Sequence, residues 1–146
     1  MDRAAMKTVL FLCTGNSARS ILGEVIFNEV FGAYGRGYSA GSKPVGRVNP
    51  AAIVELRRRG HSVEGLSSQH VEAFCGAGAP AIDVVISVCD NAAEDCPIWP
   101  GAGTPKRLHW PFPDPADVVG EAEKAAAFAA VYEGMLEKLA ALVATL

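Results

Sequence analysis

The first residues that could do chemistry are a cysteine and an arginine six positions apart. Cys13 and Arg19 enclose a short loop that contains Gly15 and Asn16, and Ser20 follows the arginine. A thiolate is a nucleophile, and the planar guanidinium of arginine can bind two oxygens of an oxyanion at once. A hydroxyl donor beside the thiolate, such as Ser20, favours the charged form. The spacing therefore predicts that Cys13 attacks a tetrahedral oxyanion held by the loop.

This chemistry requires the loop to lie between a strand and a helix. The apolar run at residues 7–12 is typical of a buried strand, and the apolar spacing over residues 18–31 predicts a helix. Loop amides and the positive end of the helix dipole then face one space, where they bind anions and lower the pKa of a thiol. Taken by itself, the six-residue spacing could also come from a structural cysteine and an unrelated arginine. The expected oxyanion-binding residues are Thr14, Gly15, Asn16, Ser17, Ala18, Arg19 and Ser20.

The rest of the chain alternates strand and helix patterns. Strands are expected at residues 38–41, 83–89 and 106–110, and helices at residues 51–59, after Ser67 or Ser68, and at residues 121–146. Asn49 and Pro50 begin the second helix, and Gly60 ends it. We expect a close packing contact at Gly23, because glycine weakens a helix interior. The alternation predicts a small doubly wound α/β fold with a parallel sheet, and no linker divides the domain expected over residues 1–146.

Reactive side chains follow three of these strands. Cys13 ends the first, Cys89 ends the third, and Asp114 comes shortly after the last. Sites in open α/β sheets lie beyond the carboxyl ends of the strands. We therefore expect these three side chains to meet at one edge of the sheet.

Composition narrows the class of protein. The 146 residues are 50% hydrophobic and 20% charged, with a formal net charge of -3. No apolar run is long enough for a secretion signal or a membrane span, so we expect a cytoplasmic protein that does not bind membranes. The basic residues 57–59 close a predicted helix, which disfavours nucleic-acid binding. Cysteines of cytoplasmic proteins are more often reactive or metal-binding than paired in disulfide frameworks.

Several segments together resemble the low-molecular-weight protein tyrosine phosphatase family, and its thioredoxin-coupled arsenate reductase branch more closely. The resemblance implies a four-stranded parallel sheet of the phosphotyrosine protein phosphatase I type, with helices on both faces. The matching segments are residues 13–20, 38–41, 48–51, 89–97 and 109–115.

Two features separate the branches. The phosphatases usually carry aromatic residues after their Asp-Pro pair, whereas residues 116–118 here are Ala, Asp and Val. Cys89 and Cys96 match the redox pair of the reductases, which a phosphatase does not need. Their spacing is poor for a zinc site in a chain with only three histidines, and the remaining alternative is that both are inert core cysteines.

The resemblance also implies a mechanism. Cys13 attacks arsenate, for which phosphate or sulfate are analogues, and Asp114 protonates the departing hydroxyl. Cys89 attacks the Cys13 adduct, Cys96 then attacks Cys89, and thioredoxin reduces the redox-active disulfide that results. Family members of this type bind no tight cofactor, and we expect a monomer. In some members potassium steadies the loop, and its ligands would map to Asn16, Glu24, Ser39 and Glu72.

Three alternatives stay open at this point. The chain could be a phosphatase that hydrolyses aryl phosphates and merely retains the two further cysteines. It could be a non-enzymatic module that binds an oxyanion or metalloid. A small thiol could replace thioredoxin as the reductant, although such a relative would not need Cys96.

Overall fold

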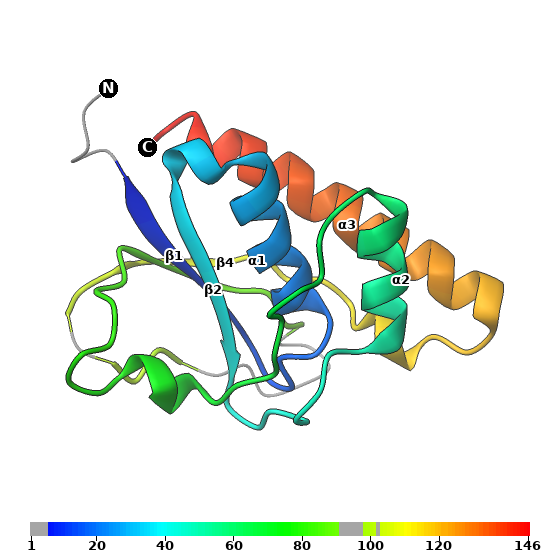
Figure 1. Cartoon of the computed structure of the whole chain (residues 1–146), viewed down its shortest axis with the longest axis horizontal. Coiled ribbons are helices and arrows are strands. Elements are labelled where there is room, and N and C mark those ends of the chain that lie inside the picture. Colours follow the sequence, from blue (N-terminus) through cyan, green and yellow to red (C-terminus); the bar gives the residue numbers. More distant parts are fainter. Residues whose placement is uncertain (1–5, 91–97, 102) are drawn as a thin grey trace.

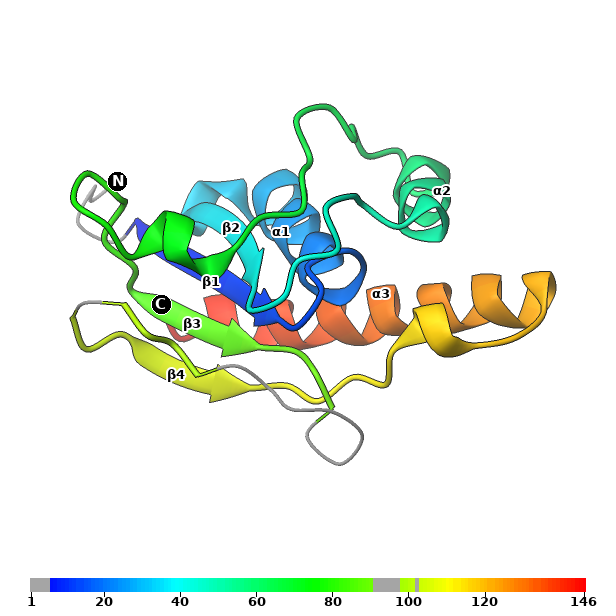
Figure 2. The ribbon, with the colours of Figure 1, turned by 90° about the horizontal axis from the view of Figure 1, so that it is seen from below.

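The computed structural model describes residues 6–90, 98–101 and 103–146. Within these ranges four strands form one parallel sheet, in the order β2-β1-β3-β4. The strands are β1 (Lys7–Cys13), β2 (Gly35–Gly41), β3 (Val84–Ser87) and β4 (Lys106–His109). Figure 2 shows their arrowheads pointing toward the same edge. The predicted four-stranded parallel fold is confirmed.

The three described α-helices lie together on one side of this sheet (Figure 1). They are α1 (Arg19–Val30), α2 (Pro50–Arg58) and α3 (Glu121–Val143), with short 3-10 helices η2 (Gly32–Tyr34), η3 (Val71–Phe74) and η4 (Pro115–Asp117). None of the helices in the described ranges is long and apolar enough to cross a membrane.

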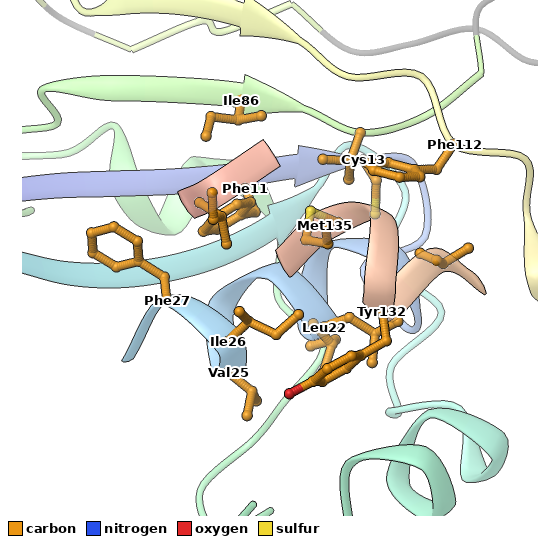
Figure 3. Packing of buried hydrophobic residues seen from close by; sticks show 14 of the residues in the cluster. Phe11, Cys13, Leu22, Val25, Ile26, Phe27, Ile86, Phe112, Tyr132 and Met135 are labelled. Carbon is orange, nitrogen blue, oxygen red and sulfur yellow. The ribbon is translucent and has the colours of Figure 1, made fainter. Parts of the chain in front are cut away.

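The main core lies between the sheet and the long helices. β1 contributes Val9 and Phe11 to it, and α1 and α3 pack against each other over the same face. Figure 3 shows the buried side chains of this layer, with Phe11 and Met135 between strand and helices. A Cβ atom at Gly23 would lie 2.5 Å from the Phe11 ring. The close contact expected at Gly23 is therefore confirmed, because the ring fills the space of a side chain.

A smaller core covers the opposite face of the sheet. Leu10 and Leu12 of β1 pack there with Val71 and Phe74 of η3 and with Trp99. Alternate side chains of β1 thus pack into apolar layers on opposite faces of the sheet, which explains why its sequence is continuously hydrophobic. In the described ranges, α1 and α3 pack over one face with α2 against them, and the 3-10 helix η3 with its flanking loops covers the other.

Most ends differ from expectation by three residues or fewer, and differences at β2, β3 and η3 have a physical reason or a bearing on the site. β2 begins at Gly35 rather than at residue 38, because its glycines pair with β1 through the backbone and leave no apolar pattern. β3 ends at Ser87, two residues before Cys89. The short helix after residue 67 is not capped by a serine: the His70 side chain accepts from Glu72 N. The helical turn expected between Cys89 and Pro97 lies largely outside the described residues.

The predicted start and end of α2 are confirmed. Asn49 caps the helix, since its side chain accepts a hydrogen bond of 2.9 Å from Ala51 N, and Pro50 is the first helical residue. Gly60 follows the end with φ of +83°, a left-handed conformation that glycine adopts readily.

Candidate active site

The loop between β1 and α1 is held from outside through its carbonyl groups. Backbone N–H groups of residues 42–49 donate to four of them: Cys13 O, Thr14 O, Gly15 O and Ser17 O, at 3.3, 2.9, 3.0 and 2.8 Å. In a planar trans peptide the N–H points opposite to the C=O. Turning the carbonyls outward therefore turns the following amides inward. The loop becomes a concave row of donors for an anion.

The Cys13 thiol lies inside this concave row. It is 2% exposed, and Asn16 N donates to its sulfur at 3.2 Å. Ser20 Oγ lies 2.9 Å from the same sulfur. Asn16 Nδ2 donates to Ser20 Oγ at 2.8 Å, so the hydroxyl proton of Ser20 is available to the sulfur. Two hydrogen-bond donors thus face the Cys13 sulfur.

Asn16, whose backbone adopts a left-handed conformation, fixes this arrangement. Its φ is +47°, and among the described non-glycine residues it alone has a positive φ. Its Oδ1 accepts from Gln69 N at 2.7 Å, 53 positions later in the chain. Asn16 is completely buried, so these bonds are shielded from water. The segment before η3 therefore holds the nucleophilic loop in shape.

Arg19 lies in the first turn of α1 and is almost fully buried. Its Nη1 donates to Phe112 O at 3.0 Å, and its Nη2 lies 3.6 Å from Asp114 Oδ2. Ala18, at the start of α1, makes no side-chain cap hydrogen bond. The positive end of this helix thus faces the loop without a competing side-chain acceptor at its cap position.

Asp114 stands opposite the nucleophile on the segment after β4. Its Oδ1 accepts from Ala116 N at 3.0 Å and begins η4, while its other oxygen faces Arg19. The side chain keeps 29% exposure, which gives a proton a path to solvent. This position suits a group that protonates a departing oxygen.

These residues surround one cavity of about 320 Å³. The Cys13–Arg19 loop forms part of its lining, together with Val45, Arg47, Asn49, Asp114 and Ala116. The cavity brings Cys13, Arg19 and Asp114 together, whereas Cys89, also expected at this edge, is not among the described lining residues. Arg47 and Gln69 were not anticipated, because only long-range contacts bring them to the loop.

The two further cysteines are placed differently. Cys89 is fully buried and lies in the same apolar cluster as Cys13, outside the described lining of the cavity. Val88 N donates to Leu12 O at 2.9 Å, so the pairing of β1 with β3 continues to the residues beside Cys13 and Cys89. Cys96 lies outside the described residues. Cys75, a free cysteine in the loop after η3, is half-buried.

The residues mapped as potassium ligands are only partly brought together. The Ser39 hydroxyl donates directly to Glu24. Gln69 connects Ser39 with Asn16, because its side-chain amide donates to Ser39 O and its backbone N donates to Asn16 Oδ1. Burial raises the pKa of Glu24, against the lowering effects of the Ser39 hydrogen bond and of Arg36. Glu72 is exposed on η3. Within the described part of the chain, no group of three His, Cys, Asp or Glu residues could hold a metal ion.

Comparison with known proteins agrees with this geometry. Residues 8–146 match the low molecular weight phosphotyrosine protein phosphatase family. The chain belongs to this family. An arsenate reductase from Bacillus licheniformis is 37% identical over 134 residues, which cover 91% of this chain and 92% of the relative.

Solved structures of the family share the fold. An arsenate reductase in a phosphate-binding state has a TM-score of 0.76 and 28% identity, and the match covers 96% of this chain and 98% of that one. A thioredoxin-dependent arsenate reductase from Corynebacterium glutamicum has a TM-score of 0.65 and 20% identity, covering 99% of this chain and 65% of that one. At 20% identity the second likeness shows the fold alone.

Proposed function

We propose that this protein is an arsenate reductase, which converts arsenate into arsenite and so detoxifies arsenic. One observation carries the proposal: a buried thiol lies in an anion-binding loop, and a second buried cysteine lies in the same apolar cluster, two residues beyond the end of the neighbouring strand. Hydrolysis of a phosphate ester needs the loop and its thiol alone. Cys89 is disulfide-bonded in this structure, and once it is reduced its thiol supplies, together with Cys13, the two electrons that a reduction requires. The arsenate reductase at 37% identity supports the same activity.

The first step joins arsenic to Cys13. Loop amides and Arg19 bind the oxygens of arsenate, and the Cys13 thiolate attacks the arsenic atom. The bond from arsenic to one hydroxyl oxygen breaks, and Asp114 supplies the proton with which that oxygen leaves as water. Asp114 is suited to this because Arg19 and the Ala116 amide hold its carboxyl group at the cavity wall.

The second step reduces arsenic. The Cys89 thiolate attacks the Cys13 sulfur, a Cys13–Cys89 disulfide forms, and the sulfur–arsenic bond breaks with its electron pair left on arsenic. Arsenic(V) becomes arsenic(III) and leaves as arsenite. Neighbouring strands lie about 4.8 Å apart, within the range of Cα separations that a disulfide spans. The Val88–Leu12 hydrogen bond supports such a separation beside Cys13 and Cys89.

The third step restores Cys13. Cys96 attacks the Cys89 sulfur, giving a Cys89–Cys96 disulfide and a free Cys13 thiolate. A dithiol of the thioredoxin type then reduces this disulfide by thiol–disulfide exchange. We place these reactions in the cytoplasm, where reductants of this kind keep protein thiols reduced.

The residues that line the cavity disfavour the aryl phosphatase alternative. No aromatic residue occurs among the described residues that line it, and the Asp114 segment continues with Ala116 where a phosphotyrosine ring would need a flanking ring. The lining fits a small inorganic oxyanion. Weak hydrolysis of a reactive aryl phosphate is still expected from Cys13 and Arg19.

Coupled reduction tests this function. The wild-type chain is mixed with arsenate, thioredoxin, thioredoxin reductase and NADPH, and NADPH oxidation is followed. We expect Cys89→Ser and Cys96→Ser to abolish steady-state turnover, whereas the matched control Cys75→Ser retains it. Cys96→Ser should still release one arsenite per chain in a single turnover. Glutathione in place of thioredoxin tests the small-thiol alternative.

Three results would contradict parts of this proposal. Wild-type turnover by Cys89→Ser would rule out the relay. Hydrolysis of p-nitrophenyl phosphate that far exceeds arsenate reduction would favour the phosphatase alternative. Oxyanion binding without arsenite formation with any thiol donor would favour a binding module.

Potassium is proposed as a loop-stabilising ion rather than a participant in the reaction. The side-chain oxygens of Asn16, Glu24 and Ser39 suit a hard cation, with Glu72 as the outer member of the set. The buried carboxyl of Glu24 would gain a counter-charge from the ion. Thermal unfolding in KCl against NaCl tests this: potassium should raise the melting temperature of the wild type and leave that of Glu24→Gln unchanged.

A further inference from the structure

The second arginine of the cavity, Arg47, has no part in the steps described above. It lies on the segment between β2 and α2, and it lines the cavity together with the Cys13–Arg19 loop. Among the described lining residues, Arg19 and Arg47 are the cationic ones. Arg19 is almost fully buried, whereas Arg47 is exposed at the opening. The two guanidinium groups thus differ in depth.

The charges at the site require more than one cation. Arsenate near neutral pH carries one or two negative charges, and the Cys13 thiolate carries another. Arg19 carries a single positive charge, and its guanidinium also contacts Phe112 O and the Asp114 carboxyl group. An uncompensated charge in a partly enclosed site is costly. A second guanidinium at the opening reduces this cost.

We propose that Arg47 is a second oxyanion-binding residue, which sets the affinity of the site for the doubly charged form of arsenate. This inference rests on the function proposed above and adds a residue to it. The guanidinium approaches the oxygens that face away from Cys13, so it contributes to binding of the substrate before sulfur attacks. It takes no part in the later exchange between cysteines.

The local backbone makes this residue easy to test. Neighbouring backbone groups hold the segment to the loop: Val45 N donates to Gly15 O, and Asn49 N donates to Ser17 O. A change of the Arg47 side chain leaves both bonds in place. Lys43 offers a matched control, because it is an exposed cation on the same segment and its side chain is outside the described cavity lining.

Calorimetric titration with inorganic phosphate measures binding without turnover. Arg47→Met keeps the aliphatic stem and removes the charge, and we expect phosphate to bind about five- to tenfold more weakly. The affinity of the wild type should rise from pH 6 to pH 8 as phosphate gains its second charge, and this rise should be smaller in Arg47→Met. Arg47→Lys should recover more than half of the lost affinity. Lys43→Met should bind like the wild type.

Kinetics give a second readout. With arsenate and a saturating reductant, Arg47→Met should raise KM about as much as it weakens phosphate binding, while kcat changes less than threefold. Equal phosphate affinity in Arg47→Met and the wild type would overturn the role of Arg47 alone. An equal loss in Lys43→Met would overturn it too, because the effect would then belong to general surface charge. A wild-type chain that binds no oxyanion would overturn both this inference and the proposed function.

Discussion

Replacing Gly41 with alanine tests whether the shape of the nucleophilic loop depends on its outer support. Gly41 ends β2 beside the loop, and its backbone N donates to Gln69 O at 2.9 Å. A Cβ atom there would lie under 3.0 Å from the carbonyl oxygen of Thr14, and 3.1 Å from both Cβ and N of Asn16. Cβ atoms in proteins essentially never lie within 3.0 Å of a heavy atom beyond their own residue and its chain neighbours. The loop backbone must therefore move.

The size of the effect follows from what the contact touches. The clash is with backbone, so no flexible side chain can relieve it, and the displacement passes directly to Asn16 and its bond to the Cys13 sulfur. Misplacing reacting groups by 1 Å costs about 10²-fold in rate. We expect Gly41→Ala to lower kcat/KM for arsenate by about 10- to 100-fold. Overpacking should lower the free energy of unfolding by about 1–3 kcal/mol.

The assay combines coupled NADPH oxidation with urea unfolding. Rates are measured at a temperature at which circular dichroism shows the variant to be folded, so that loss of activity is separated from loss of structure. Gly32→Ala is the control, since a Cβ atom there meets nothing within 4 Å. If Gly41→Ala keeps kcat/KM within threefold of the wild type, the loop does not need the close approach of β2, and the reasoning is wrong.

Three further predictions concern a hydrogen bond, a titration and a salt bridge. Ser20→Ala removes a donor to the nucleophilic sulfur and should slow arsenate reduction about 10-fold or more, measured by single-turnover arsenite release. Burial raises the pKa of Glu24, so the folded chain binds this proton more tightly than the unfolded chain. The free energy of unfolding should therefore fall as pH rises from 4.5 through the raised pKa in potassium-free buffer, and this fall should be smaller in Glu24→Gln. Arg59→Ala removes one of the arginines that bind the buried Glu55 and should lower the free energy of unfolding by about 1–3 kcal/mol in urea, with Arg57→Ala unchanged.

The sequence determined most of the elements and pointed to Cys13 as the candidate nucleophile. Buried strands leave apolar runs, and a helix leaves a periodic pattern, so β1, α1 and α3 were predicted within a few residues of their ends. The contact between Ser20 and Cys13 was equally predictable, because the two lie seven positions apart within one strand–loop–helix unit. The start of β2 was not predicted, since its glycines pair through backbone atoms that carry no side-chain signal.

Only the tertiary structure decided which distant residues complete the site. Gln69 supports Asn16 from 53 positions away, and Ser68, expected to cap a helix, instead donates to Gly15 O. Arg47 reaches the cavity because its segment is tied to the loop by backbone hydrogen bonds. Such contacts depend on how loops pack at the edge of the sheet, and no local spacing records them. The sequence therefore pointed to Cys13 as the candidate nucleophile, and the fold identified the groups that hold its loop and line the cavity beside it.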